Sequence, residues 1–380
     1  MKNILLIHQS SELYGSDKTL LLFLTHIDRK LFNPTVILPC NGPLCSELEK
    51  IDIKVVIAPV LKLYRNMFSF KNIFLFYKDY KKSINLIDTL HKQTKFHIIY
   101  SNTLAVLLGM IYARKRKIKH IWHVHEIIVH PKLIADIFPK LLYRFADVII
   151  CNSNATKNNL IQRIPELASK IKVIHNGIEI KAATNSIQTK EDFGFSSSDI
   201  VITLIGRISR LKGHKWLINT FLNHLSHIEN IKILFVGSPV KGQEYYLEEI
   251  ESSISKNALV ERVKILPFIS DLSPIWQITD IAVIPSTEAE SFGLVAAEAM
   301  LAEKPVVASN HGGLTEIVVH DITGFLIEPS DEIGLSNALF KLISDNDLRV
   351  KFGKNGKSRI LDEFTVEKYV SKITEILNHI

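Results

Sequence analysis

Short runs of apolar residues recur along the chain, and a polar loop followed by a helix-forming stretch comes after most of them. Runs of this kind occupy residues 2–7, 34–39, 97–101, 147–151, 200–206, 231–237, 281–284 and 305–309. A short, continuous apolar run is typical of a strand buried on both faces. Strands that alternate with helices pair in parallel, because the helix returns the chain to the start of the next strand. The sequence therefore predicts an α/β fold built on parallel sheets.

The length and one break in the pattern predict two domains. A chain of 380 residues is longer than one ordinary domain. The strand that begins at Ile171 is broken by Asn176 and Gly177, and residues 179–198 are polar without clear periodicity. We therefore expect one domain over 1–178, a linker over 179–198, a second domain over 199–365 and a final helix over 366–380.

Composition narrows the class of protein. The 47% apolar and 22% charged content is that of a globular protein, and no apolar run approaches the roughly 20 residues that span a bilayer. The start, Met1 to His8, predicts a strand rather than a signal peptide. Three cysteines, Cys40, Cys45 and Cys151, do not make a disulfide framework or a metal site. We expect a reducing, cytoplasmic location.

The net charge of +7 suits an anionic partner, and the basic residues are unevenly placed. Lys78, Lys81 and Lys82 follow an aromatic stretch, and residues 114–117 are all basic. No aromatic and basic nucleic-acid module is evident, so we expect no nucleic-acid partner. Segment 61–92 combines Phe, Tyr and Lys, which fits an interfacial helix that contacts a membrane or a core-facing helix with lysines outside.

The stretch 281–302 predicts a ligand site. A buried strand, 281–284, leads through a polar loop into an Ala- and Leu-rich helix that begins near Gly293. Open α/β folds bind ligands at the carboxyl ends of strands, and the N–H groups at a helix start suit a phosphate. Glu290 and Glu298, with seven residues between them, flank this start, and carboxylates accept hydrogen bonds from hydroxyls. Phosphates with hydroxyls on either side indicate a nucleotide sugar.

A second loop carries the cations that such a ligand requires. The strand 200–206 ends in Gly206, and Arg207, Arg210 and Lys212 follow it. Fixed cations at this place suit a pyrophosphate and stabilise the charge on a departing nucleoside diphosphate. Arg210 is also consistent with an exposed surface charge that binds no ligand.

The first half of the chain offers two further features. Gly15 and Ser16 form a small-residue turn just before a predicted helix, where a ligand can approach the backbone. His123 and His125 lie on the same face of a predicted strand. No third ligand is spaced to match, so we expect no metal.

Taken together, these motifs resemble those of family 4 glycosyltransferases. Glu290 and Glu298, with Ser291, Phe292 and Gly293 between them, resemble the E-x7-E motif, and Arg207 with Lys212 matches the family's basic pair. The stretch 14–22 resembles its glycine loop, although Ser16 replaces the second glycine and Asp17 or Lys18 the usual acid. His125 with Glu126 resembles its acceptor-side histidine, with His123 as a rival; we favour His125, which is last in the strand.

The resemblance implies the GT-B fold, in which two Rossmann-like domains face each other across a cleft and a last helix, here 366–380, crosses back to the first domain. It implies retaining transfer of a sugar from a UDP- or GDP-sugar to an acceptor hydroxyl without metal or cofactor. Glu298 would bind the ribose, Glu290 the sugar hydroxyls and His125 the sugar. The diphosphate would be bound by Arg207, Lys212, Gly293, Leu294 and Val295, and the base by the loop at Phe268. Further contacts with the ligand would come from Gly15, Ser16, Ser291 and Phe292.

The resemblance also implies a setting and leaves two alternatives. We expect a role in cell-surface polysaccharide synthesis, with a lipid-linked acceptor and peripheral contact with the inner face of the membrane. A nucleotide-sugar epimerase of related fold would need no acceptor. An inactive sugar-binding or regulatory subunit would keep the fold, but the joint presence of Arg207, Lys212 and both glutamates argues against it.

Overall fold

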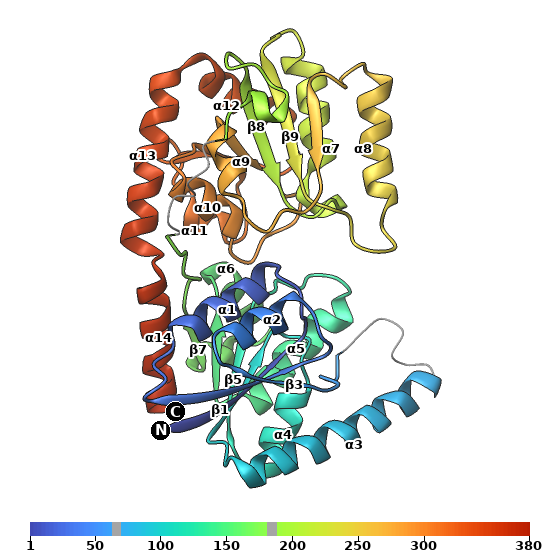
Figure 1. The fold of residues 1–380 in the computed structure, drawn as a ribbon, viewed down its shortest axis with the longest axis vertical. Helices are drawn as coiled ribbons and strands as arrows, with labels where there is room; N and C mark the ends of the chain where they lie inside the picture. Colours follow the sequence, from blue (N-terminus) through green and yellow to red (C-terminus); the bar gives the residue numbers. More distant parts are fainter. Residues whose placement is uncertain (63–69, 181–187) are drawn as a thin grey trace. The chain divides into compact units, whose positions relative to one another are not determined.

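The structure, a computed structural model, describes residues 1–62, 70–180 and 188–380. Over these residues the chain divides into two compact units (Figure 1). The first comprises residues 1–177 and 365–380, and the second residues 178–364. Each unit is a parallel sheet covered by helices, so the predicted fold class of two parallel-sheet α/β domains is confirmed.

Within the described residues, the first unit has seven strands, all paired in parallel in the order β3-β2-β1-β4-β5-β6-β7. They are β1 (Lys2–His8), β2 (Phe32–Leu38), β3 (Lys54–Ile57), β4 (Ile98–Asn102), β5 (Lys119–Val124), β6 (Val148–Cys151) and β7 (Ile171–Val173). His8 is in register with Asn102, and Asn102 with His123, so three polar residues lie side by side on adjacent strands.

The helices of the first unit cover both faces of its sheet. They are α1 (Gly15–His26), α2 (Pro43–Lys50), α3 (Phe70–Gln93), α4 (Leu108–Arg116), α5 (Lys132–Phe145), α6 (Asn154–Ile161), the 3-10 turn η1 (Pro165–Ser169) and α14 (Val366–His379). Along β1, Ile4 and Leu6 belong to one hydrophobic cluster and Leu5 and Ile7 to the other. This alternation explains why a strand buried on both faces is apolar at every position.

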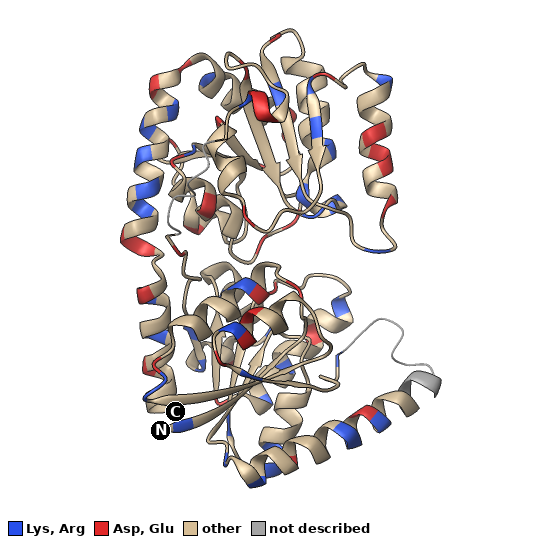
Figure 2. Ribbon diagram, viewed as in Figure 1, with Lys and Arg blue, Asp and Glu red and all other residues tan. Residues whose placement is uncertain are grey.

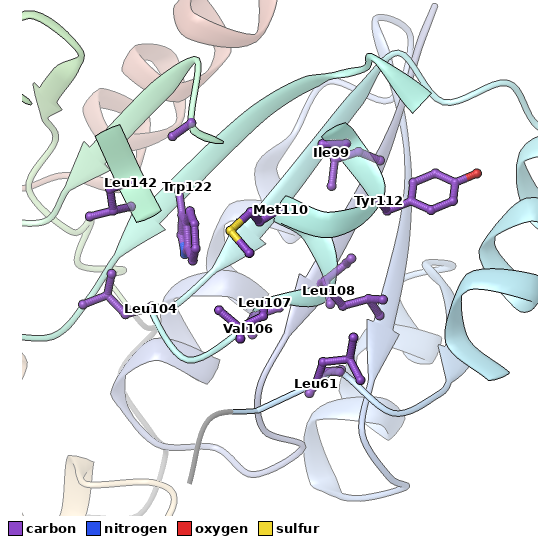
Figure 3. Close-up of a cluster of buried hydrophobic side chains, with 14 of the residues drawn as sticks. Leu61, Ile99, Leu104, Val106, Leu107, Leu108, Met110, Tyr112, Trp122 and Leu142 are labelled. Atoms are coloured by element: carbon purple, nitrogen blue, oxygen red, sulfur yellow. The ribbon is translucent and has the colours of Figure 1, made fainter. Parts of the chain in front are cut away.

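The two clusters differ in what they hold together. One contains Trp122, Met110 and Leu142, which Figure 3 shows among their neighbours. The other includes Val370 and Ile373 of α14, so the C-terminal helix is part of the core of the first unit.

Helix α3 is anchored by its second half. Ile84, Ile87 and Leu90 are buried, and Asp88 pairs with Arg116 at 2.6 Å. The first half extends away from the body of its unit (Figure 1). Residues 63–69 of the aromatic segment lie outside the described residues. No helix in the described part of the chain is both long enough and apolar enough to cross a membrane.

The described part of the chain also holds a six-stranded parallel sheet in the second unit, in the order β10-β9-β8-β11-β12-β13. Its strands are β8 (Ile200–Ile205), β9 (Ile231–Val236), β10 (Val263–Leu266), β11 (Ile281–Ile284), β12 (Val306–Ser309) and β13 (Gly324–Ile327). Of the expected linker, residues 181–187 lie outside the described residues. Phe195 is buried against Leu234 and Val236 of this unit.

Two helices of the second unit begin at aspartates that cap them. Asp331 and Asp345 each accept a backbone N–H at 2.8 Å, from Gly334 and Leu348. The helices of this unit are α7 (His214–Thr220), α8 (Tyr245–Lys256), α9 (Ser273–Ile278), α10 (Leu294–Leu301), α11 (Leu314–Ile317), α12 (Glu332–Ser344) and α13 (Asn346–Glu363), with 3-10 turns η2 (Glu191–Phe193) and η3 (Arg210–Lys212) and a π-helical turn η4 (Phe221–Leu225).

His214, at the start of α7, is buried as a neutral imidazole. Its ring packs against Phe235 with centroids 5.0 Å apart, and neither ring nitrogen has a hydrogen-bond partner among the described residues. Burial, with a smaller effect of Lys212, lowers its pKa to about 3. The unfolded chain therefore takes up a proton near pH 6.5 that the folded chain excludes, and stability falls as the pH drops below that value.

His214→Leu should make the second unit less sensitive to acid. Between pH 7.5 and pH 5.5 the wild type should lose about 1.4 kcal/mol more unfolding free energy than the variant, because the proton that His214 binds on unfolding is removed. Urea unfolding at the two pH values measures the difference. His227→Gln, at an exposed position of the same unit, is the matched control. Equal losses in wild type and His214→Leu would contradict a neutral, buried His214.

Candidate active site

The strand order of the second sheet reverses between β8 and β11. β9 and β10 lie on one side of this junction and β12 and β13 on the other, so the crossovers from the two central strands lead in opposite directions. Loops 206–213 and 285–293 leave the carboxyl ends of these strands. Open α/β sheets bind ligands at such a junction. Of the residues predicted to contact the donor, Arg207, Lys212 and 290–293 lie on these loops, and Leu294, Val295 and Glu298 lie on α10.

Lys212 and Glu290 bring the two loops together. Lys212 Nζ lies 2.7 Å from Glu290 Oε1, and Ser286 Oγ donates to the same oxygen. The side chains are 26% and 16% exposed, so the pair is shielded but reachable. Burial by itself would raise the pKa of Glu290, but Lys212 and Ser286 together outweigh burial and lower it. The site thus holds an ionised carboxylate that the adjacent ammonium neutralises.

Gly213 allows the two loops to approach closely. Its φ is +73°, and a Cβ there would lie 1.8 Å from the carbonyl oxygen of Pro285. Thr287 N–H also donates to the carbonyl of Leu211 at 2.9 Å. A side chain at position 213 would separate the loops that carry Lys212 and Glu290.

A third loop supports Glu290 from the other side. The N–H of Gly313 donates to the carbonyl of Glu290 at 2.6 Å, and His311 Nε2 lies 2.8 Å from the carbonyl of Ser286. A Cβ at Gly312 would lie 2.4 Å from the Glu290 carbonyl oxygen. Ser286 and His311 are not among the residues that the sequence motifs indicated. The one available signal was the proximity of Ser286 to Glu290 in sequence.

The other predicted donor residues occupy different environments. Arg207 is exposed just after β8. Arg210 is also exposed, and it pairs with Glu288 across the same two loops. Phe268 is 44% exposed and its N–H donates to Ser238 Oγ at 3.0 Å. Gly293, with φ +106°, is followed directly by α10.

The residues around the start of α10 differ in what they can offer. Phe292 packs in the core against Phe364, so only its backbone could contact a ligand. Ser291, Leu294, Val295 and Glu298 are partly exposed.

The first unit has a hydrogen-bonded cluster at the corresponding junction, between β1 and β4. His8 Nε2 lies 2.5 Å from Asp17 Oδ1, and His8 Nδ1 lies 2.9 Å from the amide nitrogen of Asn102. The amide oxygen of Asn102 lies 2.9 Å from His125 Nε2. The sequence pattern indicated His125 but not His8 or Asn102, which become partners only through strand register.

His123 and His125 differ in how deeply they are buried. Their rings are in contact, with centroids 3.9 Å apart and planes tilted by 37°, but His123 is 1% exposed and His125 is 9% exposed. His123 Nδ1 bonds the hydroxyl of Tyr100 at 2.7 Å, and burial lowers its pKa to about 3. Burial, followed by the effects of His123 and His8, also lowers the pKa of His125. Both imidazoles are therefore neutral near pH 7.

The glycine loop differs from its expected place. Gly15 and Ser16 do not precede the helix but form the first residues of α1, with Tyr14 as its N-cap. Asp17 Oδ2 accepts the N–H of Tyr14 at 2.9 Å while Oδ1 binds His8. Asp17, rather than Lys18, therefore stands in the position of the family's acidic residue, and its carboxylate is buried against His8.

Glu126 holds the backbone at the end of β5. Its Oε2 lies 3.1 Å from the N–H groups of Leu104 and His125. Burial raises the pKa of Glu126 to about 7 although these N–H groups act in the opposite direction. Among the described residues, no group of three or more His, Cys, Asp and Glu side chains is arranged to hold a metal ion.

Comparison with known families agrees with both halves of this arrangement. The family described as Glycosyltransferase Family 4 matches residues 15–182, and that described as Glycosyl transferases group 1 matches residues 185–359. The chain belongs to glycosyltransferase family 4. As a family 4 glycosyltransferase it is an enzyme, and the two matches meet close to the boundary between the two units.

Named relatives and solved structures extend over most of the chain. A capsular polysaccharide biosynthesis glycosyltransferase, CapM, of Staphylococcus aureus is 27% identical over 80% of this chain and 81% of its own length. The UDP-Gal:alpha-D-GlcNAc-diphosphoundecaprenol alpha-1,3-galactosyltransferase of Escherichia coli is 26% identical over 91% and 88%. The structure of Anabaena HepE in complex with UDP and glucose matches with a TM-score of 0.85, 26% identity and full coverage of both chains.

Gly213→Ala should disrupt the site through the backbone alone. The methyl group would meet the Pro285 carbonyl and should lower the unfolding free energy by about 3 kcal/mol or more. Gly242→Ala is a matched control: its φ is +84°, but a Cβ there has nothing within 4 Å, so only about 1 kcal/mol of backbone strain is expected. Chemical denaturation compares the two. Equal losses would show that the contact with Pro285 is unimportant.

Proposed function

We propose that this glycosyltransferase moves a sugar from a UDP-sugar to a hydroxyl of a lipid-linked glycan, with retention at the anomeric carbon, at the cytoplasmic face of a membrane. The product would enter a cell-surface polysaccharide. The observation that carries the proposal is the Lys212–Glu290 pair at the strand-order junction of the second unit. UDP as the donor nucleotide is supported by the complexes of HepE with UDP, glucose and UDP-glucose.

The charges at the junction fit a nucleotide sugar. A diphosphate needs cations, and an ionised carboxylate beside it would repel it. Lys212 cancels the charge of Glu290, which leaves the carboxylate free to accept hydrogen bonds from sugar hydroxyls. Arg207 would supply the positive charge that stabilises the departing UDP, together with the N–H groups of Gly293, Leu294 and Val295 at the start of α10. Glu298 would bind the ribose, and the loop at Phe268 the base.

The first unit would contribute His125 to the reaction. A neutral imidazole accepts a hydrogen bond from a hydroxyl without adding charge. Gly15 and Ser16, in the first turn of α1, are proposed as ligand contacts of the same unit. We propose that the reaction needs no metal, since Arg207 and Lys212 provide the cations, and retention follows the chemistry of the family.

Helix α3 is proposed to contact the membrane that holds the acceptor. Phe74, Leu75 and Tyr77 are 69%, 42% and 53% exposed, and Lys81 Nζ lies 4.7 Å above the ring of Tyr77. Exposed lysines follow at 78, 81 and 82, and Figure 2 shows the basic residues along this helix. Aromatic side chains beside lysines suit the boundary between headgroups and acyl chains.

A pocket formed by α4 and the end of α5 also carries basic residues. It has a volume of about 350 Å³ and is lined by Met110, Ile111, Arg114, Lys115 and Phe145. Lys115 lies 3.5 Å from Asp88 of α3, so the pocket adjoins the helix. Together these residues offer apolar contact and positive charge to an anionic lipid.

Lys212→Ala and Glu290→Gln should have opposite effects on UDP binding. Loss of the ammonium should weaken UDP binding by about 10-fold or more, because a charge-assisted contact is lost and Glu290 remains unpaired. Loss of the carboxylate charge should leave UDP binding unchanged or tighter but lower sugar transfer by about 10²-fold. Thermal shift with UDP, GDP and ADP, with and without EDTA, measures binding, and product NMR reports transfer and anomeric configuration.

Arg210→Ala, which removes only the exposed partner of Glu288, is the control for these variants. Stabilisation by GDP alone would overturn the choice of UDP, and equal weakening in both variants would overturn the role of the pair. A free sugar epimer formed without acceptor would favour an epimerase.

Lys78→Glu, Lys81→Glu and Lys82→Glu together should abolish binding to vesicles that contain phosphatidylglycerol. Each lysine near an anionic surface contributes about 1 kcal/mol, so the three should account for at least about 10²-fold in affinity. Co-sedimentation measures this, with phosphatidylcholine vesicles as reference. The control is Lys215→Glu, Lys241→Glu and Lys256→Glu, three exposed lysines of the second unit. Equal sedimentation of both triple variants would refute the contact.

A further inference from the structure

We propose that Asp17, His8 and Asn102 are positioning residues that hold the ring of His125 with Nδ1 as a hydrogen-bond acceptor for a substrate hydroxyl. The inference rests on the proposed function, because it concerns how His125 acts in the transfer. It is drawn from a chain of three hydrogen bonds that joins α1, β1, β4 and the end of β5.

The donors and acceptors in this series of hydrogen bonds are assigned from its buried end, at Asp17. The Asp17 carboxylate accepts from the N–H of Tyr14 and also from His8 Nε2. His8 Nδ1 lies 2.9 Å from the Asn102 amide nitrogen and 3.3 Å from the Asn102 backbone carbonyl oxygen. Because an amide nitrogen can only donate, Nδ1 accepts the shorter of these two hydrogen bonds. The amide oxygen of Asn102 then faces His125 and accepts from its Nε2–H. Each link fixes the next, because an amide cannot exchange its donor and acceptor ends without turning over.

The outer end of the chain is His125. Asp17, His8 and Asn102 are each 1% exposed or less, whereas His125 is 9% exposed. Its Nε2 is used by Asn102, and among the described residues Nδ1 has no hydrogen-bond partner and is not fully enclosed. Nδ1 is therefore the nitrogen that a substrate can reach, and it carries a lone pair rather than a proton.

Groups packed around His125 favour the same state. The tilted ring of His123 contacts the ring of His125, and His123 Nδ1 is bonded to the Tyr100 hydroxyl. Glu126 accepts the backbone N–H of His125. Two neighbouring imidazoles and burial oppose a positive charge on His125. A neutral acceptor suits a hydroxyl group of the substrate and disfavours a carboxylate.

Asn102→Asp separates positioning from simple structural support. A carboxylate beside Nε2 should let His125 take up a proton at higher pH than in the wild type, and the imidazolium cannot accept a hydrogen bond through Nδ1. Transfer by Asn102→Asp should therefore fall by about 10-fold or more at low pH and recover as the pH rises. Asn102→Leu, which removes the chain without adding charge, should lose transfer at every pH. Tyr100→Phe, which cuts only the bond to His123, should keep the wild-type pH profile.

Two further readouts complete the test. Histidine ¹⁵N chemical shifts, assigned with His125→Gln, should show a protonated Nε2 and a bare Nδ1 for His125 in the wild-type enzyme. A protonated Nδ1, or the same pH-independent loss in Asn102→Asp and Asn102→Leu, would overturn the proposal. Thermal stabilisation by UDP reports on the second unit. If UDP does not stabilise the wild-type enzyme, the proposed function is contradicted. If UDP stabilises the Asn102 variants as it does the wild type, their loss of transfer arises at His125 and not in the second unit.

Discussion

The reversal of strand order in each parallel sheet is the constraint on which both candidate sites depend. Helices that follow the neighbouring strands β8 and β11 lead the chain in opposite directions, and the loops before them meet at the carboxyl edge of the sheet, which is where open α/β sheets bind ligands. The same reversal between β1 and β4 places His8 beside Asn102 in the first sheet.

The two units stabilise their buried ionisable groups in different ways. In the second unit, Glu290 remains ionised because Lys212 and Ser286 outweigh the cost of burial. In the first unit, His123 and His125 remain neutral because burial disfavours their charged forms. The first arrangement suits a charged diphosphate and the second a neutral hydroxyl, which agrees with a division between donor and acceptor.

Close backbone contacts, rather than side chains, set the position of the second site. Gly213 fits against the Pro285 carbonyl and Gly312 against the Glu290 carbonyl. Three loops therefore meet around Glu290 with no space for a Cβ at either contact. Because such packing permits little movement, Lys212 and Glu290 can be held together before any ligand arrives.

The sequence by itself determined the fold class, since a strand buried on both faces needs an unbroken apolar run such as residues 200–205. It also indicated the family, because Lys212, Glu290 and Glu298 resemble the motif residues of family 4 glycosyltransferases. Tertiary structure alone decided that His8, Asn102 and Asp17 adjoin His125, since strand register joins residues far apart in the chain. It also decided that Ser286 and His311 support Glu290, and that Phe292 faces the core. Local periodicity reports which face of an element is buried, whereas these contacts depend on which elements become neighbours.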